Sequence, residues 1–246
     1  MEFNLQSWLF LVVVFLTNII QCITGFAGTV LAMPASVLLI GDTSAKAILN
    51  VLGAAASIGV IIPNFRKINV REFLKIVGLM LPGIVGGYFL NQALASYTRL
   101  AHILLGGVVI FFAVLNFVQL MSKKEMKKPG KVLSVIILLG SGLIHGVFVC
   151  GGPLLVTYAS RQFDDTTEFR ATLSAVWIVL NGVMIFSHYK SGYFDPATLW
   201  LLLFSLAVLV FAIVLGNLIA KKLSRKAFLI LSYVLMVISG VSLIVK

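Results

Sequence analysis

Residues 25–34 read GFAGTVLAMP, and this glycine-rich stretch lies near the middle of the first apolar segment, 8–40. That segment has 33 residues, whereas a helix crosses the hydrocarbon core of a bilayer with about 20. Gly25, Gly28 and Pro34 are residues that break or bend a helix. We therefore predict a discontinuous segment, in which two shorter helices meet at a glycine-rich turn. A single long helix that is tilted and kinked is the alternative.

A second apolar segment, 132–160, has the same character in the other half of the chain. It has 29 residues and carries the stretch GVFVCGGPL at 146–154, so we predict a second discontinuous segment. Three ordinary apolar segments follow each of the two, and each of them suits one crossing. They run over about 45–62, 73–94 and 100–121 in the first half, and 169–186, 197–220 and 228–245 in the second.

The same order of elements in both halves indicates an internal repeat. Short matches accompany it, because GTVL at 28–31 corresponds to GGPL at 151–154, and GYFL at 87–90 corresponds to GNLI at 216–219. The predicted domains are an N-terminal membrane repeat at 1–122, a basic linker at 123–131 and a C-terminal membrane repeat at 132–246.

The composition fits a chain that is embedded in lipid. Hydrophobic residues make up 60% of the 246 residues and charged residues only 11%, and the mean hydropathy is +1.09. Soluble domains typically carry about 25% charged residues. We predict an all-α, multi-pass protein of the cell membrane. The net charge of +11 does not indicate a nucleic-acid partner, because the lysines and arginines cluster in short linkers and no soluble domain presents a basic face.

The charged loops predict how the two repeats are oriented. In the first half the loop at 66–75 is basic and the next loop has only Arg99, whereas in the second half the loop at 190–195 is nearly neutral and the loop at 221–226 is basic. Equivalent loops thus prefer opposite sides under the positive-inside rule, as inverted repeats require. If both broken segments are re-entrant, every basic loop lies in the cytoplasm, with the linker 123–131. Full crossings would place 221–226 outside, so we predict the re-entrant form.

The sequence contains none of the common catalytic or nucleotide-binding motifs. There is no His-Glu-x-x-His, no phosphate-binding loop and no nucleophile elbow. The three histidines, His102, His145 and His188, are scattered, and nothing in their spacing requires that they converge on a metal. We therefore predict a protein that is not an enzyme and that has neither a metal site nor a cofactor.

The glycine-rich breaks are the best candidates for a binding site. In transporters, broken helices present half-helix N-termini near the middle of the membrane, where free N–H groups and the helix dipole favour an anion. Thr29 and Cys150, which lie beside the breaks, would add weak donors. The predicted glycine contacts are Gly25, Gly28, Gly151 and Gly152. Alternatively, small residues such as Gly28 allow helices to pack tightly, and both roles are compatible in one segment.

Polar residues inside the apolar segments complete the candidate site. Asn50 and Asn181 lie in the spans that follow the breaks, although buried amides also commonly bridge helices. Arg170 could bind two oxygens of a sulfonate, sulfite or carboxylate group, or it could pair with Asp164, Asp165 or Glu168. His145 is a candidate proton relay, with a core histidine as the alternative.

The stretch at 25–34, followed by the polar turn GDTS at 41–44, resembles the opening motif of the TauE/SafE sulfite exporter-like permeases. The stretch at 146–154 resembles the second copy of that motif, and the similarity covers nearly the whole chain. This resemblance implies transport of sulfur-containing anions such as sulfite, organosulfonates or sulfoacetate-like compounds. The chain differs from the family pattern at Thr29 and Cys150, where glycine is common.

From these observations we predict a secondary transporter of a small anion, with a site between the two repeats and an alternating-access mechanism. A passive anion channel and a membrane subunit of a larger transport complex are the alternatives. The expected partners are the anionic substrate and the lipid bilayer, with protons as a candidate coupling ion because few acidic residues are available for a sodium site. The exact substrate, the direction of transport and the formation of a homodimer are left open.

Overall fold

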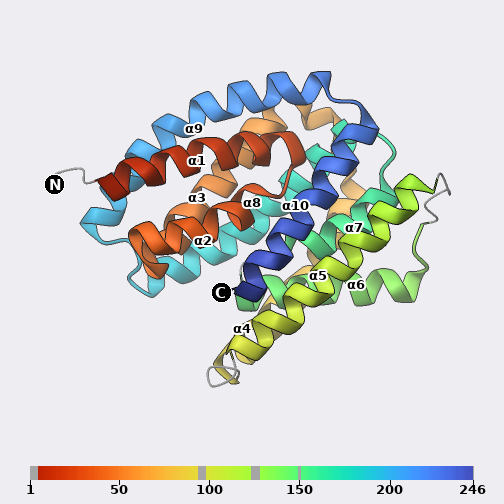
Figure 1. Cartoon of the computed structure of the whole chain (residues 1–246), viewed down its shortest axis with the longest axis horizontal. Coiled ribbons are helices and arrows are strands. Elements are labelled where there is room, and N and C mark those ends of the chain that lie inside the picture. The colour runs from red at the N-terminus through yellow and green to blue at the C-terminus, as the bar shows by residue number, and fades with distance from the viewer. Residues whose placement is uncertain (1–4, 94–97, 123–127, 149–150, 246) are drawn as a thin grey trace. The chain divides into compact units, whose positions relative to one another are not determined.

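A computed structural model describes residues 5–93, 98–122, 128–148 and 151–245. Within these residues the regular structure is helical and no strand occurs, which confirms the predicted all-α class (Figure 1). The helices in chain order are α1 (Leu5–Thr24), α2 (Gly28–Ile40), α3 (Asp42–Ile61), the 3₁₀-helix η1 (Ile62–Lys67), α4 (Val70–Ala93), α5 (Thr98–Met121), α6 (Lys131–Phe148), α7 (Gly152–Gln162), α8 (Thr166–Lys190), α9 (Pro196–Lys222) and α10 (Arg225–Val245).

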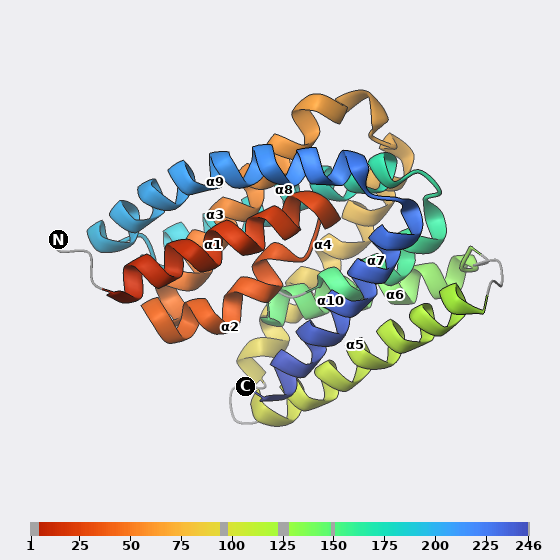
Figure 2. The same cartoon turned by 45° about the horizontal axis from the view of Figure 1, so that its top comes forward.

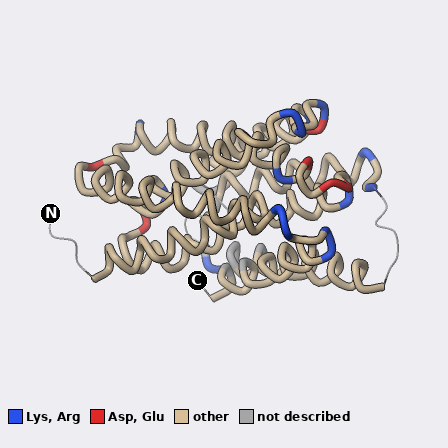
Figure 3. Tube along the Cα trace, turned by 90° about the horizontal axis from the view of Figure 1, so that it is seen from above, with Lys and Arg blue, Asp and Glu red and all other residues tan. Residues whose placement is uncertain are grey.

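Among the described residues, six helices are long and apolar enough to cross a membrane. They are Leu5–Thr24, Asp42–Lys67, Val70–Leu90, Thr166–Lys190, Pro196–Lys222 and Arg225–Ser242. Most of the helical length carries no charged residue (Figure 3). Large apolar side chains such as Trp8, Phe111 and Phe211 are exposed. Lipid solvates such side chains and water does not, so the chain is a multi-pass membrane protein.

Both long apolar segments are broken at the predicted glycine-rich stretches. In the first, α1 ends at Thr24 and α2 begins at Gly28. In the second, α6 ends at Phe148 and α7 begins at Gly152. At a rise of 1.5 Å per residue, the 13 residues of α2 reach only about 20 Å, short of a hydrocarbon core of about 30 Å. The prediction of discontinuous segments is confirmed, and that of one long kinked helix is wrong.

The first broken segment is a helical hairpin. Gly25 has a φ of 83°, a left-handed conformation that glycine adopts at little cost. The chain reverses there, and α2 runs back beside α1 in both views (Figures 1 and 2). The end of α2 therefore lies toward the side on which α1 begins. The 20 residues of α1 are nevertheless more than a half-crossing helix requires.

The helices form two compact units. The first unit comprises Met1–Ile68 and Arg170–Leu223, and the second comprises Asn69–Phe169 and Ser224–Lys246. In the first unit, α1 packs along α2 and α9, and α3 packs against α2 and α9. In the second unit, α4 packs along α6, α5 along α10, and α7 against α6 and α5.

Each unit thus combines helices from both predicted repeats. By the order of elements, α1 corresponds to α6 and α9 to α4, so the α1–α9 and α6–α4 pairs are the same pairing with the repeats exchanged. This exchange fits two intertwined repeats. Units defined by packing do not test repeats defined by sequence. The domain boundaries therefore stay predictions, with repeats at 1–122 and 132–246 and a linker at 123–131.

Candidate functional site

Side chains of α1 shape the break in the first unit. The Thr24 hydroxyl oxygen accepts hydrogen bonds from the backbone N–H of Phe26 at 3.4 Å and of Ala27 at 3.3 Å. The N–H of Gly28 donates to Gln21 Oε1 at 2.7 Å. These bonds hold the turn in place, and one of them uses the N–H of Gly28, which was predicted to contact the anion. Neither Thr24 nor Gln21 was predicted to shape the break. Both could have been recognised as polar residues just before Gly25 in an otherwise apolar segment.

The first turn of α2 keeps further donors available. The N-cap residue, Ala27, has no side-chain acceptor, and the first intrahelical bond of this turn runs from the N–H of Leu31 to Ala27 O at 3.1 Å. The N–H groups of Thr29 and Val30 lie in the turn that an α-helix cannot satisfy internally. Together with the positive end of the helix dipole, these two groups suit an anion.

Two predicted site residues, Thr29 and Asn181, approach the same point on α3. A Cβ atom added to Gly53 would lie 3.2 Å from Thr29 Oγ1 and 3.0 Å from Asn181 Nδ2. A hydroxyl from α2 and an amide from α8 therefore converge where α3 has no side chain. Gly53 was missed by sequence reasoning, because a glycine inside a helix signals close packing without naming what approaches it.

Asn50 lies about one turn before Gly53 on α3 and is fully buried. Its Nδ2 donates to Lys46 O at 2.9 Å and lies 3.5 Å from His188 Nδ1. Its Oδ1 has no hydrogen-bond partner among the described residues, and neither has the buried hydroxyl of Ser174 on α8. Buried polar groups are normally paired, so these two atoms would gain from polar contact with a ligand.

Arg170 joins the end of α1 to α9. Its Nε donates to Cys22 O at 2.9 Å, its Nη2 donates to the same carbonyl, and Nη2 also donates to Asn217 Oδ1 at 2.8 Å. The backbone of Arg170 also adjoins the break, since a Cβ on Gly25 would lie 3.4 Å from Arg170 Cα. These partners differ from the acidic residues that the sequence suggested. Asp164 pairs with Arg225, and Glu168 accepts from Asn69.

At the second break, Gly151 has a packing role. A Cβ on Gly151 would overlap Ser141 O and lie 2.8 Å from His145 Cβ, and the Ser141 hydroxyl donates to Gly151 O at 2.7 Å. Gly152 is buried at the start of α7, and His145 is buried beside Gly151. These three predicted residues belong to the second unit. Cys150 lies outside the described residues.

Gly28 has a packing role as well, because a Cβ there would lie 2.6 Å from Gln21 Cβ and 2.9 Å from Thr17 O. The tight-packing alternative therefore fits both breaks. It does not exclude binding, since a glycine that lets α2 approach α1 also places the first turn of α2.

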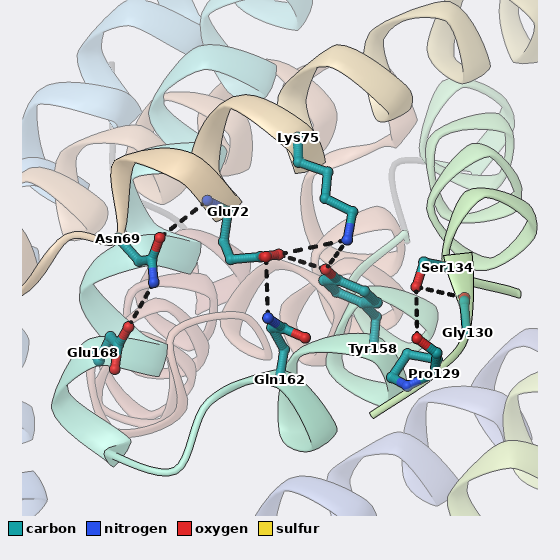
Figure 4. A network of polar contacts seen from close by, with 9 residues as sticks. All are labelled: Asn69, Glu72, Lys75, Pro129, Gly130, Ser134, Tyr158, Gln162 and Glu168. Carbon is teal, nitrogen blue, oxygen red and sulfur yellow. Dashed lines mark hydrogen bonds and ion pairs between the residues drawn. The ribbon is translucent and has the colours of Figure 1, made fainter. Parts of the chain in front are cut away.

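The second unit also contains a polar cluster that the sequence did not reveal (Figure 4). Glu72 on α4 accepts hydrogen bonds from Tyr158 and Gln162 of α7, and Lys75 lies beside them. In the sequence, this part of α4 was recognisable only as part of a basic loop. Among the described residues, no group of three or more His, Cys, Asp or Glu side chains could hold a metal ion.

Comparison with known proteins identifies the family. The family model described as Sulfite exporter TauE/SafE matches residues 10–243. The chain is 26% identical over 185 residues to the "Probable inner membrane transporter protein TsaS" of Comamonas testosteroni, which covers 73% of this chain and 74% of that protein. No solved structure matches the chain. With its apolar helices, its two glycine-rich breaks and a family match over nearly its whole length, the chain belongs to the TauE/SafE sulfite exporter family, a family of membrane transporters and not of enzymes.

Proposed function

We propose that this protein is a secondary transporter of small sulfur-containing anions, sulfite or sulfonates, that works by alternating access. The family description supports the class of substrate, and the relative from Comamonas testosteroni is named as an inner membrane transporter. The part of the site that binds the anion lies in the first unit, at the start of α2.

The observation that carries this proposal is the approach of Thr29 Oγ1 and Asn181 Nδ2 to Gly53. A sulfite or sulfonate group presents three oxygen acceptors on one sulfur atom, so it requires several donors within a small volume. The Thr29 hydroxyl, the Asn181 amide and the first-turn N–H groups of α2 are donors of that kind. Asn50, with its Nδ2 bound to Lys46 O, would need to reorient to contribute.

Neutral donors suit a transporter, which must release its substrate as well as bind it. A buried Arg–anion contact would be stronger and slower to dissociate. We propose that Arg170 raises the electrostatic potential at the break and fixes the break through Cys22 O and Asn217. This role replaces the two-oxygen contact expected from the sequence.

In the alternating-access mechanism, the two repeats change their relative arrangement around the bound anion. The proposed counterpart of α2 is α7, which begins at Gly152 after a corresponding break. Protons are the proposed coupling ion, and the basic linker 123–131 is placed in the cytoplasm by the positive-inside rule.

Uptake of labelled sulfite and of a labelled alkanesulfonate into liposomes that contain the purified protein tests this function. We expect saturable uptake and counterflow, in which unlabelled substrate inside the liposomes accelerates entry of the label. Flux that does not saturate and shows no counterflow would indicate the passive channel. No flux of any sulfur anion would reject the substrate class.

Two glycine variants test the position of the site. Gly53→Ala places a methyl group between Thr29 and Asn181, so we expect the apparent affinity for the anion, measured from the concentration dependence of uptake, to fall about tenfold or more, which corresponds to roughly 1.4 kcal/mol of binding free energy. Gly182→Ala is the matched control, because Gly182 follows Asn181 on α8 and a Cβ there meets nothing within 4 Å. Equal apparent affinity in the two variants, both folded, would remove Gly53 from the site.

A further inference from the structure

The second unit holds a buried carboxylate that the proposed binding site does not use. Glu72 lies in the first turn of α4 and is only 8% exposed. Tyr158 donates its hydroxyl proton to Glu72 Oε2, and Gln162 Nε2 donates to Oε1 at 3.0 Å (Figure 4). Lys75 Nζ lies 3.9 Å from Glu72 Oε2 and donates to the Tyr158 hydroxyl at 2.8 Å. We call these four residues the Glu72 cluster.

The Glu72 cluster joins two helices of different kinds. Glu72 and Lys75 belong to α4, an apolar helix long enough to cross the membrane. Tyr158 and Gln162 lie one turn apart on α7, the short helix that follows the second glycine-rich break. The carboxylate therefore accepts from two successive turns of α7, and hydrogen bonds to a charged acceptor are about twice as strong as neutral ones. The Glu72 carboxyl group thus links α7 to α4 through two hydrogen bonds.

Polar and charged groups on the neighbouring helices make contacts of their own. Asn69 bridges Glu72 to α8, since its Oδ1 accepts from the Glu72 N–H at 3.1 Å and its Nδ2 donates to Glu168 Oε1 at 2.9 Å. Arg161 of α7 donates to Asn116 and Gln119 of α5. On α6, which packs along α4, the titratable groups are Lys131 at the first residue and His145 in the last turn. Within the described residues, Lys75 is the cation beside the carboxylate.

The cluster reaches the protein surface through Lys75. The side chain of Lys75 is 39% exposed, while that of Glu72 is 10% exposed, so one member of the cluster contacts the surroundings and the carboxylate lies behind it. Glu72 and Lys75 lie within 66–75, a basic stretch predicted to lie on the cytoplasmic side. A buried carboxylate contributes little to stability if its only role is to hold two helices together, because the free energy of its desolvation offsets much of the attraction to its partners. Ionisable groups within membrane segments instead commonly mark proton pathways.

We propose that Glu72 is the protonation site that couples proton movement to anion transport. This inference rests on the proposed transport function. The carboxylate takes one proton from cytoplasmic water and releases it to water on the opposite side of the membrane in the same transport cycle, so that one O–H bond forms and later breaks. Protonation removes the charge that Tyr158 and Gln162 bind and leaves the Lys75 charge unpaired. The contact between α7 and α4 weakens, and α7, which begins at the predicted site residue Gly152, is free to shift.

Proteoliposomes with a labelled alkanesulfonate test the proposal, because a sulfonate stays anionic over the working pH range and a pH gradient then acts on the protein alone. One assay measures accumulation driven by a gradient of one pH unit. The other measures counterflow at equal pH on both sides. For one proton moved with each anion, the wild-type protein is expected to accumulate label about tenfold.

Glu72→Gln keeps the shape of the side chain and cannot titrate. We expect this variant to lose gradient-driven accumulation and to retain counterflow within about twofold of wild type. Asp164→Asn is the control, because Asp164 is an acidic residue of the same unit that pairs with Arg225 and not with the Glu72 cluster, and it should retain both activities. Accumulation by Glu72→Gln at the wild-type level would overturn the proposal. Loss of counterflow together with accumulation in a folded variant would overturn it too, since Glu72 would then act in folding or substrate binding.

A measurement without substrate covers the remaining outcomes. Infrared difference spectra of the purified wild-type protein on acidification should show the C=O stretch of a protonated carboxyl group, shifted in Tyr158→Phe, which lacks the phenol donor. If Glu72→Gln does not fold, the spectra of the wild-type protein and of Tyr158→Phe test the proposal instead. A carboxyl band at the same position in both proteins would overturn it. If the wild-type protein moves no sulfur anion, the proposed function fails, while the spectra still report whether Glu72 takes up a proton.

Discussion

At the scale of single residues, Arg170 shows how one side chain can organise a helix break. Its guanidinium donates to Cys22 O at the end of α1, where the helix dipole is negative and the last carbonyls lack intrahelical donors. It also donates to Asn217, whose Nδ2 donates in turn to Gly59 O at 3.1 Å. Four elements of the first unit thus meet through two polar side chains. From the sequence, Arg170 was predicted to bind two oxygens of an anion or to pair with a nearby acidic residue, and a backbone carbonyl could not be identified as its partner.

Asp195 is the residue whose ionisation most simply tests a local contact. It lies in the loop before α9 as the N-cap, and its carboxylate accepts from the N–H of Thr198 at 2.6 Å. This hydrogen bond lowers the pKa of Asp195 below its ordinary value. A lowered pKa in the folded state means that the stabilisation is complete above the unfolded pKa of about 3.9 and is lost as the pH falls through the folded value.

We therefore expect Asp195→Ala to lower the free energy of unfolding by about 1 kcal/mol at neutral pH, the usual contribution of an N-cap. The difference from wild type should shrink below pH of about 4. Asp195→Asn, a neutral N-cap, should keep most of the stability and show no such pH dependence. Thermal unfolding in detergent, measured over this pH range, provides the comparison. A constant difference between wild type and Asp195→Ala at all pH values would contradict the assignment.

At the scale of helices, glycine determines which pairs of elements can approach closely. Gly83 and Gly87 of α4 face Gly142 and Gly146 of α6, and a Cβ at any of the four would overlap backbone atoms of the other helix. These are two Gly-x-x-x-Gly motifs in contact, the arrangement that brings membrane helices together when no hydrophobic effect drives them. Gly216 of α9, which the sequence repeat matches to Gly87, packs in the same way against Ile19 O of α1.

The neighbouring glycines of α4 provide a direct test of this packing. A Cβ on Gly87 would overlap Leu143 O, whereas a Cβ on Gly86 meets nothing within 4 Å. We expect Gly87→Ala to destabilise the protein by about 1–3 kcal/mol through overpacking, and Gly86→Ala to stabilise it by up to about 1 kcal/mol through helix propensity. The thermal unfolding temperatures of the two variants should move in opposite directions. A common direction would mean that α4 and α6 are not held by close contact at this position.

At the scale of the whole molecule, the sequence predicted the features that depend on one continuous segment. It did not predict contacts between residues that lie far apart in the sequence. The two breaks followed from segment length and from glycine, because the thickness of the bilayer sets an independent limit on a helix. The packing of α1 against α9 and of α4 against α6 could not be predicted. Hydropathy identifies apolar helices but does not say which of them are neighbours. The Glu72 cluster was hidden for the same reason: Tyr158 is 86 positions away from Glu72 in the sequence.

The re-entrant topology can be tested on α9, whose two ends must lie on opposite sides of the membrane if its 27 residues cross once. Single cysteines at Ser191, before α9, and at Ser224, after it, would be introduced into a variant without Cys22 and Cys150. Both serines are exposed. If both broken segments turn back, the basic loop at 221–226 is cytoplasmic under the positive-inside rule. An impermeant maleimide added outside intact cells should then label Ser191→Cys and not Ser224→Cys.

The labelling pattern also tests whether the α1–α2 hairpin returns to the side of the membrane on which α1 begins. With 20 residues, α1 can cross the bilayer by itself, yet α2 returns beside it, so the hairpin delivers α3 to the side from which α1 began. Three crossings per repeat then follow, and the charged loops agree with them. With both hairpins returning, the loop at 221–226 lies on the same side as the other basic loops, so labelling of Ser224→Cys from outside would place all of them outside, against the positive-inside rule. The antiparallel α1–α2 pair would then have a different relation to the membrane from the one that the positive-inside rule predicts.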